Sequence, residues 1–306
     1  MWFPNRKPTS VEKIQHSNPM MWLEECFNEY KAFIPEDLPS FSGGLVGHFS
    51  FESVCFFEDT IKRKEQTNDI NAPDISLIIC KDFIVFDKTH NKVFIVVFSD
   101  NSKKGYDDSN EKVSNYEKLL VTDLHPNDHA KAAQKTTVKY DFERDDFISA
   151  VKKIKKYISS GDVMQVVLSQ RMMIDFPEKP IDFYRELRQI NPSPYMYYLN
   201  MGEYTVVGSS PEILVRLEDK KVTVRPIAGT RPRGDSKESD DNYEIDLLRD
   251  NKELAEHLML IDLGRNDIGR ICETGSIKLT DQMIIERYSH VMHMVSNVEG
   301  SINSDS

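Results

Sequence analysis

The chain has 306 residues, of which 39 are basic and 50 acidic, and its net charge is -11. This length allows one large domain or two ordinary ones, and the acidic balance argues against a general nucleic-acid surface. No apolar run approaches the ~20 residues of a membrane-spanning helix, so no membrane association is expected. The cysteines (Cys26, Cys55, Cys80 and Cys272) are far apart, which indicates reduced thiols in a cytoplasmic protein.

The N-terminal part of the chain predicts a helix followed by strands. A helix is expected over Met20–Phe33, which ends before Pro35. Three runs of β-branched and aromatic residues, Ile75–Cys80, Phe83–Phe86 and Val93–Phe98, are separated by short polar turns. Such close spacing predicts an antiparallel meander, because parallel neighbours need long crossovers.

A polar stretch over residues 99–140 is interpreted as a domain connection. Within it, Asn110–Leu120 has a helical pattern, and Leu124–Thr137 is expected to be the loosest part. We therefore predict an N-terminal region over residues 1–137 and a second domain over residues 138–306.

The second half opens with an amphipathic helix. Phe147, Val151, Ile154 and Ile158 recur at a 4-3-4 spacing opposite a run of lysines, and Gly161 ends the pattern. A solvated helix face explains the lysines better than a binding patch does.

The remaining elements alternate between strands and one long helix, predicted over Glu244–Leu263. Strands are expected at Val163–Leu168, Tyr195–Leu199, Tyr204–Val207, Ile213–Leu217, Lys221–Arg225, Ser276–Glu286 and His290–Glu299. This order indicates an α+β fold with large, mainly antiparallel sheets packed with helices.

Two polar residues stand out in apolar surroundings. Gln165 interrupts the predicted strand at 163–168, where an amide either satisfies neighbouring backbone groups or positions a ligand. Glu212 precedes an apolar strand, where it is either a turn residue or a general acid whose pKa is raised by partial burial.

The segment Arg225–Gly234 is the densest group of candidates. Gly229 allows close backbone approach, Thr230 offers a hydroxyl, and three arginines are available for carboxylates. A Pro/Gly turn with solvated arginines is the alternative that this pattern leaves open.

Two further pairs are placed by their spacing. Glu253 and Glu256 lie one helical turn apart, so they either form an exposed face or include a ligand of Mg²⁺. His290 and His293 point to opposite faces of the predicted strand, so at most one of them serves a given pocket.

Three long segments, taken together and in this order, resemble the chorismate-utilising enzymes, and among these the component I proteins of anthranilate synthases. These segments are Arg225–Gly234, Ala255–Asp267 and Arg287–His293. The resemblance runs from about residue 41 to residue 300.

The resemblance implies a role for each matching residue. Glu256 is similar to a ligand of the catalytic Mg²⁺, and Gly229 and Thr230 to substrate contacts. Glu212 resembles the acid that protonates the departing 4-hydroxyl of chorismate, and His293 the histidine that assists proton transfer.

Gln165 and Ala228 are the substrate-binding positions that sort members of the family. The resemblance implies that isochorismate synthases carry a water-activating lysine at the position of Gln165. It also implies that aminodeoxychorismate synthases carry a nucleophilic lysine at the position of Ala228. A glutamine and an alanine therefore favour ammonia as the attacking species, and anthranilate and pyruvate as products.

The resemblance also implies partners. Ammonia would come from glutamine through a separate amidotransferase subunit, component II. The segment Asn191–Met196 matches one side of a feedback site for L-tryptophan, so Pro194, Tyr195 and Met196 are the expected inhibitor contacts.

The family pattern continues beyond residue 306 with a substrate-binding arginine and a second magnesium glutamate. The chain is therefore expected to be truncated at both ends, with an incomplete C-terminal fold, and to be inactive alone. The alternatives are a silent fragment that retains fold or subunit contacts, and another chorismate enzyme, an aminodeoxychorismate synthase.

Overall fold

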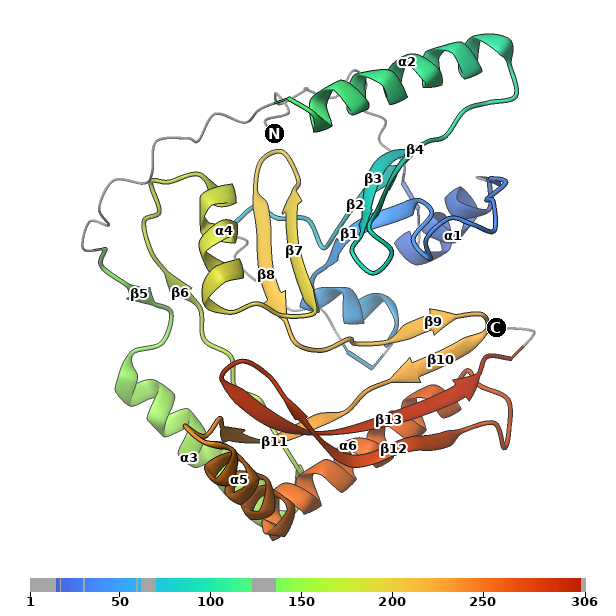
Figure 1. The fold of residues 1–306 in the computed structure, drawn as a ribbon. Coiled ribbons are helices and arrows are strands. Elements are labelled where there is room, and N and C mark those ends of the chain that lie inside the picture. Colours follow the sequence, from blue (N-terminus) through green and yellow to red (C-terminus); the bar gives the residue numbers. More distant parts are fainter. Residues whose placement is uncertain are drawn as a thin grey trace. The chain divides into compact units, whose positions relative to one another are not determined.

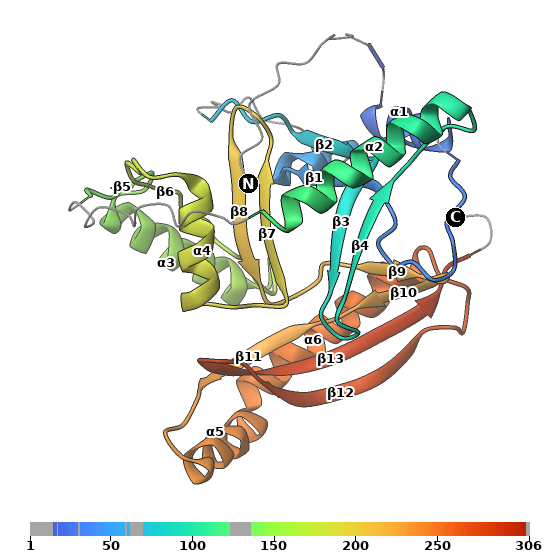
Figure 2. The same ribbon diagram turned by 45° about the horizontal axis from the view of Figure 1, so that its top comes forward.

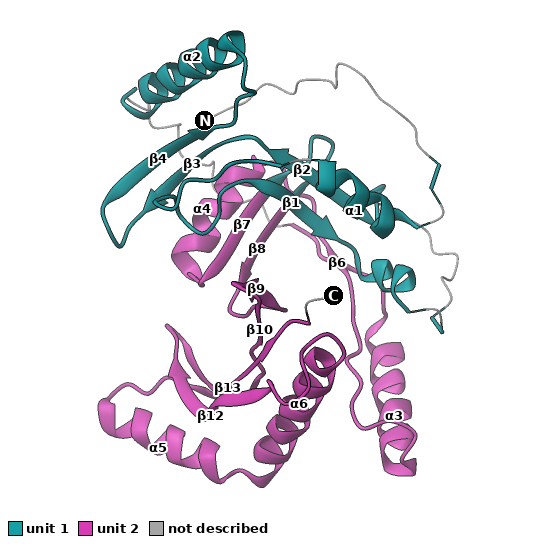
Figure 3. Ribbon diagram, turned by 90° about the vertical axis from the view of Figure 1, so that its right-hand side faces the viewer, with its two compact units in different colours: residues 1–129, 199–205 teal, residues 130–198, 206–306 magenta. Residues whose placement is uncertain are grey.

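The computed structural model describes residues 15–16, 18–29, 31–58, 60–61, 70–122 and 136–303. The chain divides into two compact units, shown in different colours in Figure 3. Unit 1 comprises residues 1–129 and 199–205, and unit 2 comprises residues 130–198 and 206–306. Within the described ranges, no helix is long and apolar enough to cross a membrane.

Unit 1 contains two antiparallel strand pairs and a long helix that lies against the last strand. Its elements are α1 (Pro19–Glu29), β1 (Gly44–Phe49), η1 (Phe51–Phe56), β2 (Ile75–Cys80), β3 (Asp82–Asp87), β4 (Lys92–Val97) and α2 (Lys103–Leu120) (Figure 1). Helix α2 begins earlier than predicted because the Ser102 hydroxyl accepts the Gly105 N–H at 2.9 Å and caps the first turn. Of the predicted loose segment, residues 124–135 lie outside the described residues.

The three strands of the predicted meander and the pairing of the last two are confirmed, but the expected pairing of the first two is wrong. Strands β3 and β4 form the expected hairpin, whereas β2 pairs with β1. Only Lys81 separates β2 from β3, which is too short for a hairpin loop. Gly47 allows β1 to approach instead, since a Cβ there would lie 1.9 Å from the Ser76 carbonyl oxygen.

Unit 2 is built around a five-stranded antiparallel sheet with helices on one face. Strand β13 pairs with β12 along one edge and with β11 and then β10 along the other, and β9 lies beyond β10. Figures 1 and 2 show α6 running along this sheet. The elements are β5 (Lys139–Tyr140), α3 (Arg144–Ser160), β6 (Met172–Met173), α4 (Pro180–Ile190), β7 (Tyr195–Asn200), β8 (Thr205–Ser210), β9 (Arg216–Glu218), β10 (Lys221–Val224), β11 (Ile227–Pro232), α5 (Lys237–Arg249), α6 (Asn251–Gly269), β12 (Lys278–Arg287) and β13 (Val291–Ser301).

The core of unit 2 lies between the sheet and these helices. Met292, Met294 and Val298 alternate along β13 and are fully buried. They pack in two clusters that include Leu247 from α5 and Ile261 from α6. The period of two along β13 therefore sends one set of side chains to the core and leaves His293 on the opposite face.

The single helix predicted over 244–263 is two helices. The backbone of Asp250 is extended, and its carboxylate accepts the N–H groups of Lys252 at 3.0 Å and Glu253 at 3.2 Å. Asp250 therefore ends α5 and caps α6, which periodicity alone does not reveal. The predicted helix at 147–158 is confirmed as α3, and Gly161 closes it at φ +80°.

The predicted strand Val163–Leu168 is wrong. No described strand pairs with this segment, and 75% of Met164 and 87% of Val167 are exposed. A strand needs a hydrogen-bonded neighbour and a buried face, and the local sequence supplies neither.

Candidate active site

A β-bulge in β11 is the centre of the candidate site. The pairing register with β13 shifts between Ala228 and Thr230, which leaves Gly229 as the extra residue at φ +70°. A Cβ on Gly229 would lie 2.9 Å from Leu247 Cδ1 and 3.5 Å from Glu253 Oε2. The bulge thus requires glycine and brings the backbone of β11 close to α6.

His293 lies directly across from the bulge. Its Nδ1 is 3.0 Å from the Thr230 hydroxyl and 3.4 Å from the Gly229 carbonyl oxygen. Its Nε2 has no hydrogen-bond partner among the described residues. The ring is therefore held at one nitrogen and available at the other. His290 precedes β13 and its ring contacts the Ser289 hydroxyl instead, so it is not part of the strand that carries His293.

Glu212 follows β8 and approaches the start of β11. Burial of the side chain raises the pKa of its carboxyl group, while the Ile227 N–H and the charge of Arg225 oppose this shift. The net shift is upward, so the carboxyl group keeps its proton to a higher pH than an ordinary glutamate. That is the property that a general acid needs.

Arg225, Glu286 and Tyr288 form a polar chain beside Glu212 and His293. The Arg225 guanidinium is ion-paired with Glu286, and the Tyr288 hydroxyl donates to Glu286 Oε2 at 2.9 Å. The Tyr288 ring meets the His293 ring edge to face, with 5.4 Å between centroids. Tyr288 lies within the segment Arg287–His293 and Glu286 immediately precedes it, but no role was predicted for either residue.

The arginines expected to be available for carboxylates are all paired with acidic residues of this chain. Arg231 contacts Asp246 and Asp250, with its Nε 2.6 Å from Asp246 Oδ2. Arg225 and Arg233 are held by Glu286 and Asp240 respectively. The expectation that these three arginines are available is therefore wrong, because carboxylates of α5, its C-cap and β12 pair with them.

Two carboxylates of α6 flank a cation. The Lys252 ammonium lies 3.4 Å from Glu253 Oε1 and 3.8 Å from Glu256 Oε2. The amide of Gln165 donates to the other oxygen, Glu256 Oε1, at 2.9 Å. Sequence positions 91 residues apart are thus joined by one hydrogen bond.

This donor set is compatible with a magnesium ion. Mg²⁺ in proteins takes one or two carboxylates and keeps several waters. Glu253 and Glu256 offer two carboxylates, both of which approach the Lys252 ammonium. The described residues contain no group of three or more histidine, cysteine, aspartate or glutamate side chains arranged around a metal position.

Ala228 lies in β11 opposite Met294 of the buried face of β13, so the chain places a methyl group beside the bulge. No nucleophilic side chain is available at this position.

Of the other predicted binding residues, Pro194 immediately precedes β7, and Tyr195 and Met196 are its first two residues. The Tyr195 hydroxyl accepts a hydrogen bond from Arg216 at 2.8 Å. Tyr195 also lines a polar cavity of about 580 Å³ in unit 2 that extends over the sheet to Arg225. Arg225 therefore lies on this cavity and in the polar chain beside Glu212.

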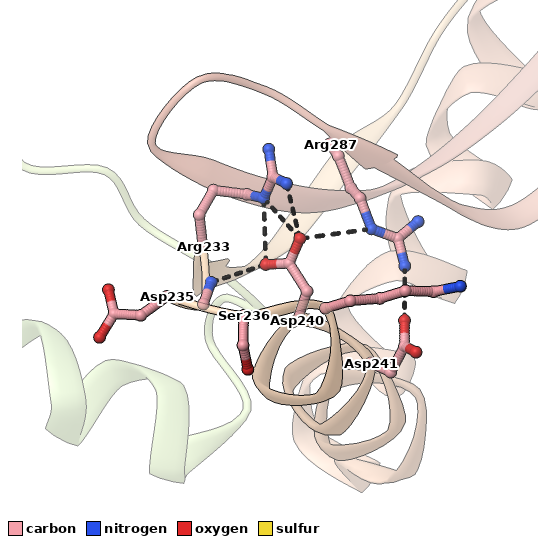
Figure 4. Close-up of a pocket in the computed structure, with 8 residues that line it drawn as sticks. Arg233, Asp235, Ser236, Asp240, Asp241 and Arg287 are labelled. Atoms are coloured by element: carbon pink, nitrogen blue, oxygen red, sulfur yellow. Dashed lines mark hydrogen bonds and ion pairs between the residues drawn. The ribbon is translucent and has the colours of Figure 1, made fainter.

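A second cavity, of about 610 Å³, lies at the start of α5. Figure 4 shows Asp240 between two guanidinium groups: Arg233 Nη2 is 2.6 Å from its Oδ2, and Arg287 Nε is 3.9 Å away. The Gly234 N–H also donates to Asp240, and these contacts lower the pKa of its carboxyl group to about 2. Because the charges are mutually satisfied, this group ties β11, α5 and β12 together.

The chain is similar to known proteins along nearly all of its length. The sequence model for chorismate binding enzymes matches residues 4–306. The anthranilate synthase component 1 of Pseudomonas putida is 45% identical over 297 residues, covering 95% of this chain and 60% of the relative. That of Neisseria meningitidis serogroup B is 45% identical over 296 residues, covering 94% and 60%.

A solved structure agrees with the predicted α+β architecture. The crystal structure of anthranilate synthase component I from Streptococcus pneumoniae TIGR4 matches with a TM-score of 0.84 at 32% identity. The match covers 96% of this chain and 64% of that one. The chain thus spans about 60% of the length of the curated relatives named above.

Proposed function

We propose that this chain, which belongs to the family of chorismate binding enzymes, acts as component I of an anthranilate synthase. Ammonia would add at C2 of chorismate while the 4-hydroxyl leaves as water, and elimination of pyruvate would then give anthranilate. The 45% identity to proteins of that name supports the assignment.

The observation that carries the proposal is the environment of Gln165. Its amide donates to Glu256, so this position holds a neutral hydrogen-bond donor where the family's isochorismate synthases carry a water-activating lysine. An amide cannot take a proton from water, which disfavours water as the nucleophile. Ala228 likewise lacks the amine of the aminodeoxychorismate synthases, so external ammonia remains.

Glu212, His293 and the bulge residues would share the chemistry. Glu212, whose pKa is raised by burial, would give a proton to the departing 4-hydroxyl. His293 would assist proton transfer through its unbonded Nε2, because Nδ1 is occupied by Thr230. The backbone at Gly229 and the Thr230 hydroxyl would contact the substrate, since no Cβ obstructs the approach.

Glu256 would hold Mg²⁺, with Glu253 as the neighbouring carboxylate. The ion, when bound, would neutralise and fix the ring carboxylate of chorismate. Gln165 would orient Glu256 by holding Oε1, so that Oε2 faces the cation position near Lys252.

The proposal includes the partners of this reaction. Ammonia would be delivered by a glutamine amidotransferase, component II, in the cytoplasm. L-Tryptophan would act as feedback inhibitor at Pro194, Tyr195 and Met196. The cavity beside Tyr195 supports this assignment, because it offers both a ring and polar groups.

The test is product formation by the purified full-length protein. With chorismate, an ammonium salt and Mg²⁺, we expect fluorescent anthranilate and an equal amount of pyruvate. Glu212→Gln should lower kcat roughly 100-fold or more, because the hydroxyl then leaves without its acid. Glu186→Gln, a change at an exposed glutamate of α4 outside both cavities, is the matched control and should keep activity. Isochorismate or aminodeoxychorismate as the main product would refute the assignment.

A further inference from the structure

A continuous chain of contacts leads from Arg225 to His293. The Arg225 guanidinium pairs with Glu286 Oε1, and the Tyr288 hydroxyl donates to Oε2 of the same carboxylate. The Tyr288 ring then meets the His293 ring at 5.4 Å and an interplanar angle of 65°. Glu286 and His293 are also direct partners in the β12–β13 ladder.

We propose that Glu286 and Tyr288 are positioning residues of this active site: Glu286 holds Arg225 with one carboxylate oxygen and Tyr288 with the other, and Tyr288 fixes the His293 ring. Neither residue is assigned contact with the substrate. The proposal deepens the proposed function and rests on it for its catalytic consequence.

The first consequence concerns the charge beside Glu212. The groups that act on this carboxyl are the Ile227 N–H, the Arg225 guanidinium and, farther along the polar chain, Tyr288. Arg225 favours the ionised form of Glu212, which is the wrong form for a general acid. Because Glu286 pairs with Arg225, the positive charge is largely neutralised and Glu212 keeps its proton.

The second consequence concerns the orientation of His293. Burial and the hydrogen bond to Glu286 raise the pKa of Tyr288, so its hydroxyl remains protonated and continues to donate. The ring is therefore anchored at its hydroxyl end, and its contact with His293 limits rotation of the imidazole. With Nδ1 held by Thr230, Nε2 is aimed in one direction.

A purely structural role for the ion pair makes different predictions. Unit 2 contains a suitable comparison, the Arg287–Glu244 pair, which also links β12 to a separate element. The side chains of Arg225 and Glu286 are 30% and 28% exposed, and those of Arg287 and Glu244 are 36% and 30% exposed. Arg287 also lies near Asp240 and Asp241, at 3.9 Å and 3.6 Å. Only the first pair adjoins Glu212 and His293, so Glu244→Gln is the control for removing an ion-pair partner elsewhere on β12.

The primary test is the titration of Glu212 in the full-length protein, followed by NMR with ¹³C-labelled glutamate carboxyl groups. The Glu212 signal is assigned with Glu212→Gln. We expect Glu286→Gln to lower the titration midpoint of Glu212 by about one pH unit, because Arg225 is then unpaired. Glu244→Gln should leave the midpoint unchanged. An unchanged midpoint in folded Glu286→Gln, or an equal shift in both variants, would overturn the proposal.

The second test measures turnover. In Glu286→Gln the basic limb of the pH–rate profile should move to lower pH by the same amount as the Glu212 midpoint. Tyr288→Phe, which keeps the ring but loses the anchoring hydrogen bond, should lower kcat up to about 100-fold with little change in KM. Unchanged kcat in Tyr288→Phe would refute the role of Tyr288. If the wild-type protein forms no anthranilate, the proposed function fails, and the Glu212 titration still decides the positioning role of Glu286.

Discussion

At the scale of single residues, two carboxyl groups of unit 2 show how surroundings set the chemistry of similar side chains. Burial raises the pKa of Glu212, whereas Arg233 and the Gly234 N–H lower that of Asp240 to about 2. The first is suited to carry a proton, and the second is permanently ionised near neutral pH. Only the first therefore qualifies as an acid catalyst, although both lie close to the same glycine-containing strand.

Glu256→Gln is expected to abolish magnesium-dependent turnover. The amide keeps the size of the side chain but offers Mg²⁺ a neutral ligand in place of an anionic one. The measurement is anthranilate formation against Mg²⁺ concentration, together with calorimetric Mg²⁺ binding. Glu273→Gln, at an exposed position beyond α6, is the control and should behave as wild type. Magnesium binding of unchanged strength in Glu256→Gln would rule out its role as a ligand.

Gln165→Leu is expected to weaken magnesium binding roughly 10-fold. The hydrogen bond from Nε2 to Glu256 Oε1 is lost, so the carboxylate is no longer held in one orientation. Calorimetric titration with Mg²⁺ measures the effect directly. Gln170→Leu removes a longer amide contact, 3.4 Å to the Phe142 carbonyl oxygen, and should leave the affinity as it was. Equal affinities in wild type and Gln165→Leu would show that the amide does not orient Glu256.

At the scale of elements, the site depends on two local interruptions of regular structure. The bulge at Gly229 turns β11 toward α6, and the cap at Asp250 starts α6 in the position where Glu253 faces that bulge. Asp250 also contacts Arg231 of β11 at 2.9 Å, so one carboxylate links the strand and the helix start. Without the bulge in β11 or the helix break at Asp250, Gly229 of the strand and Glu253 of the helix would lie farther apart.

Gly229→Ala is expected to lower the free energy of unfolding by about 1–3 kcal/mol, because alanine is strained at the positive φ of this position. Crowding of the new methyl group should lower it further. The new methyl group would meet Leu247, which is fully buried and has little room to move. Gly275→Ala is the matched control, because φ there is +83° and no atom lies within 4 Å of an added Cβ. Urea denaturation of both variants measures the difference. A loss no greater in Gly229→Ala than in Gly275→Ala would mean that β11 is not closely packed on Leu247 of α5.

At the scale of the whole molecule, several basic side chains of unit 2 are held in local ion pairs, which leave the net charge of -11 unchanged. Arg225, Arg231 and Arg233 all have acidic partners, and Lys252 lies between two glutamates. An anionic substrate therefore meets few unpaired cations in this part of the chain. A bound magnesium ion would supply positive charge where the net charge of -11 works against binding.

The stability of unit 2 is expected to fall as the pH drops below about 6.5. His257 is fully buried, its Nε2 contacts the Ser296 hydroxyl at 2.7 Å, and burial lowers its pKa from 6.5. Because the folded pKa is the lower one, the unfolded chain binds this proton first, and stability is greatest above pH 6.5. From there down to the folded pKa, the loss is at most about 1.4 kcal/mol per pH unit.

Denaturation measured between pH 8 and pH 5 tests this dependence. His257→Gln should flatten the curve over that range, since glutamine can bond Ser296 without titrating. The stabilisation by Asp240 lies in a separate window: it is present above pH 3.8 and lost as the pH falls toward about 2. A slope that persists unchanged in His257→Gln would assign the pH dependence to other groups.

The amino-acid sequence by itself determined most elements and the set of chemically important residues. Periodicity located α3 and most of the strands of unit 2, because burial of one face imposes a regular pattern on neighbouring residues. The three motif segments pointed to the family, and Gly229, Thr230 and His293 do lie together in the structure.

Only the tertiary structure decided how these residues pair. The contact between Gln165 and Glu256 and the chain from Arg225 through Glu286 and Tyr288 join segments far apart in sequence. The wrong strand at 163–168 has the same origin, whereas the helix was wrongly continued across Asp250 because hydrophobic periodicity does not record a cap. Local patterns record which side chains are apolar, whereas strand partners and the charge beside a carboxyl group depend on segments brought together by folding.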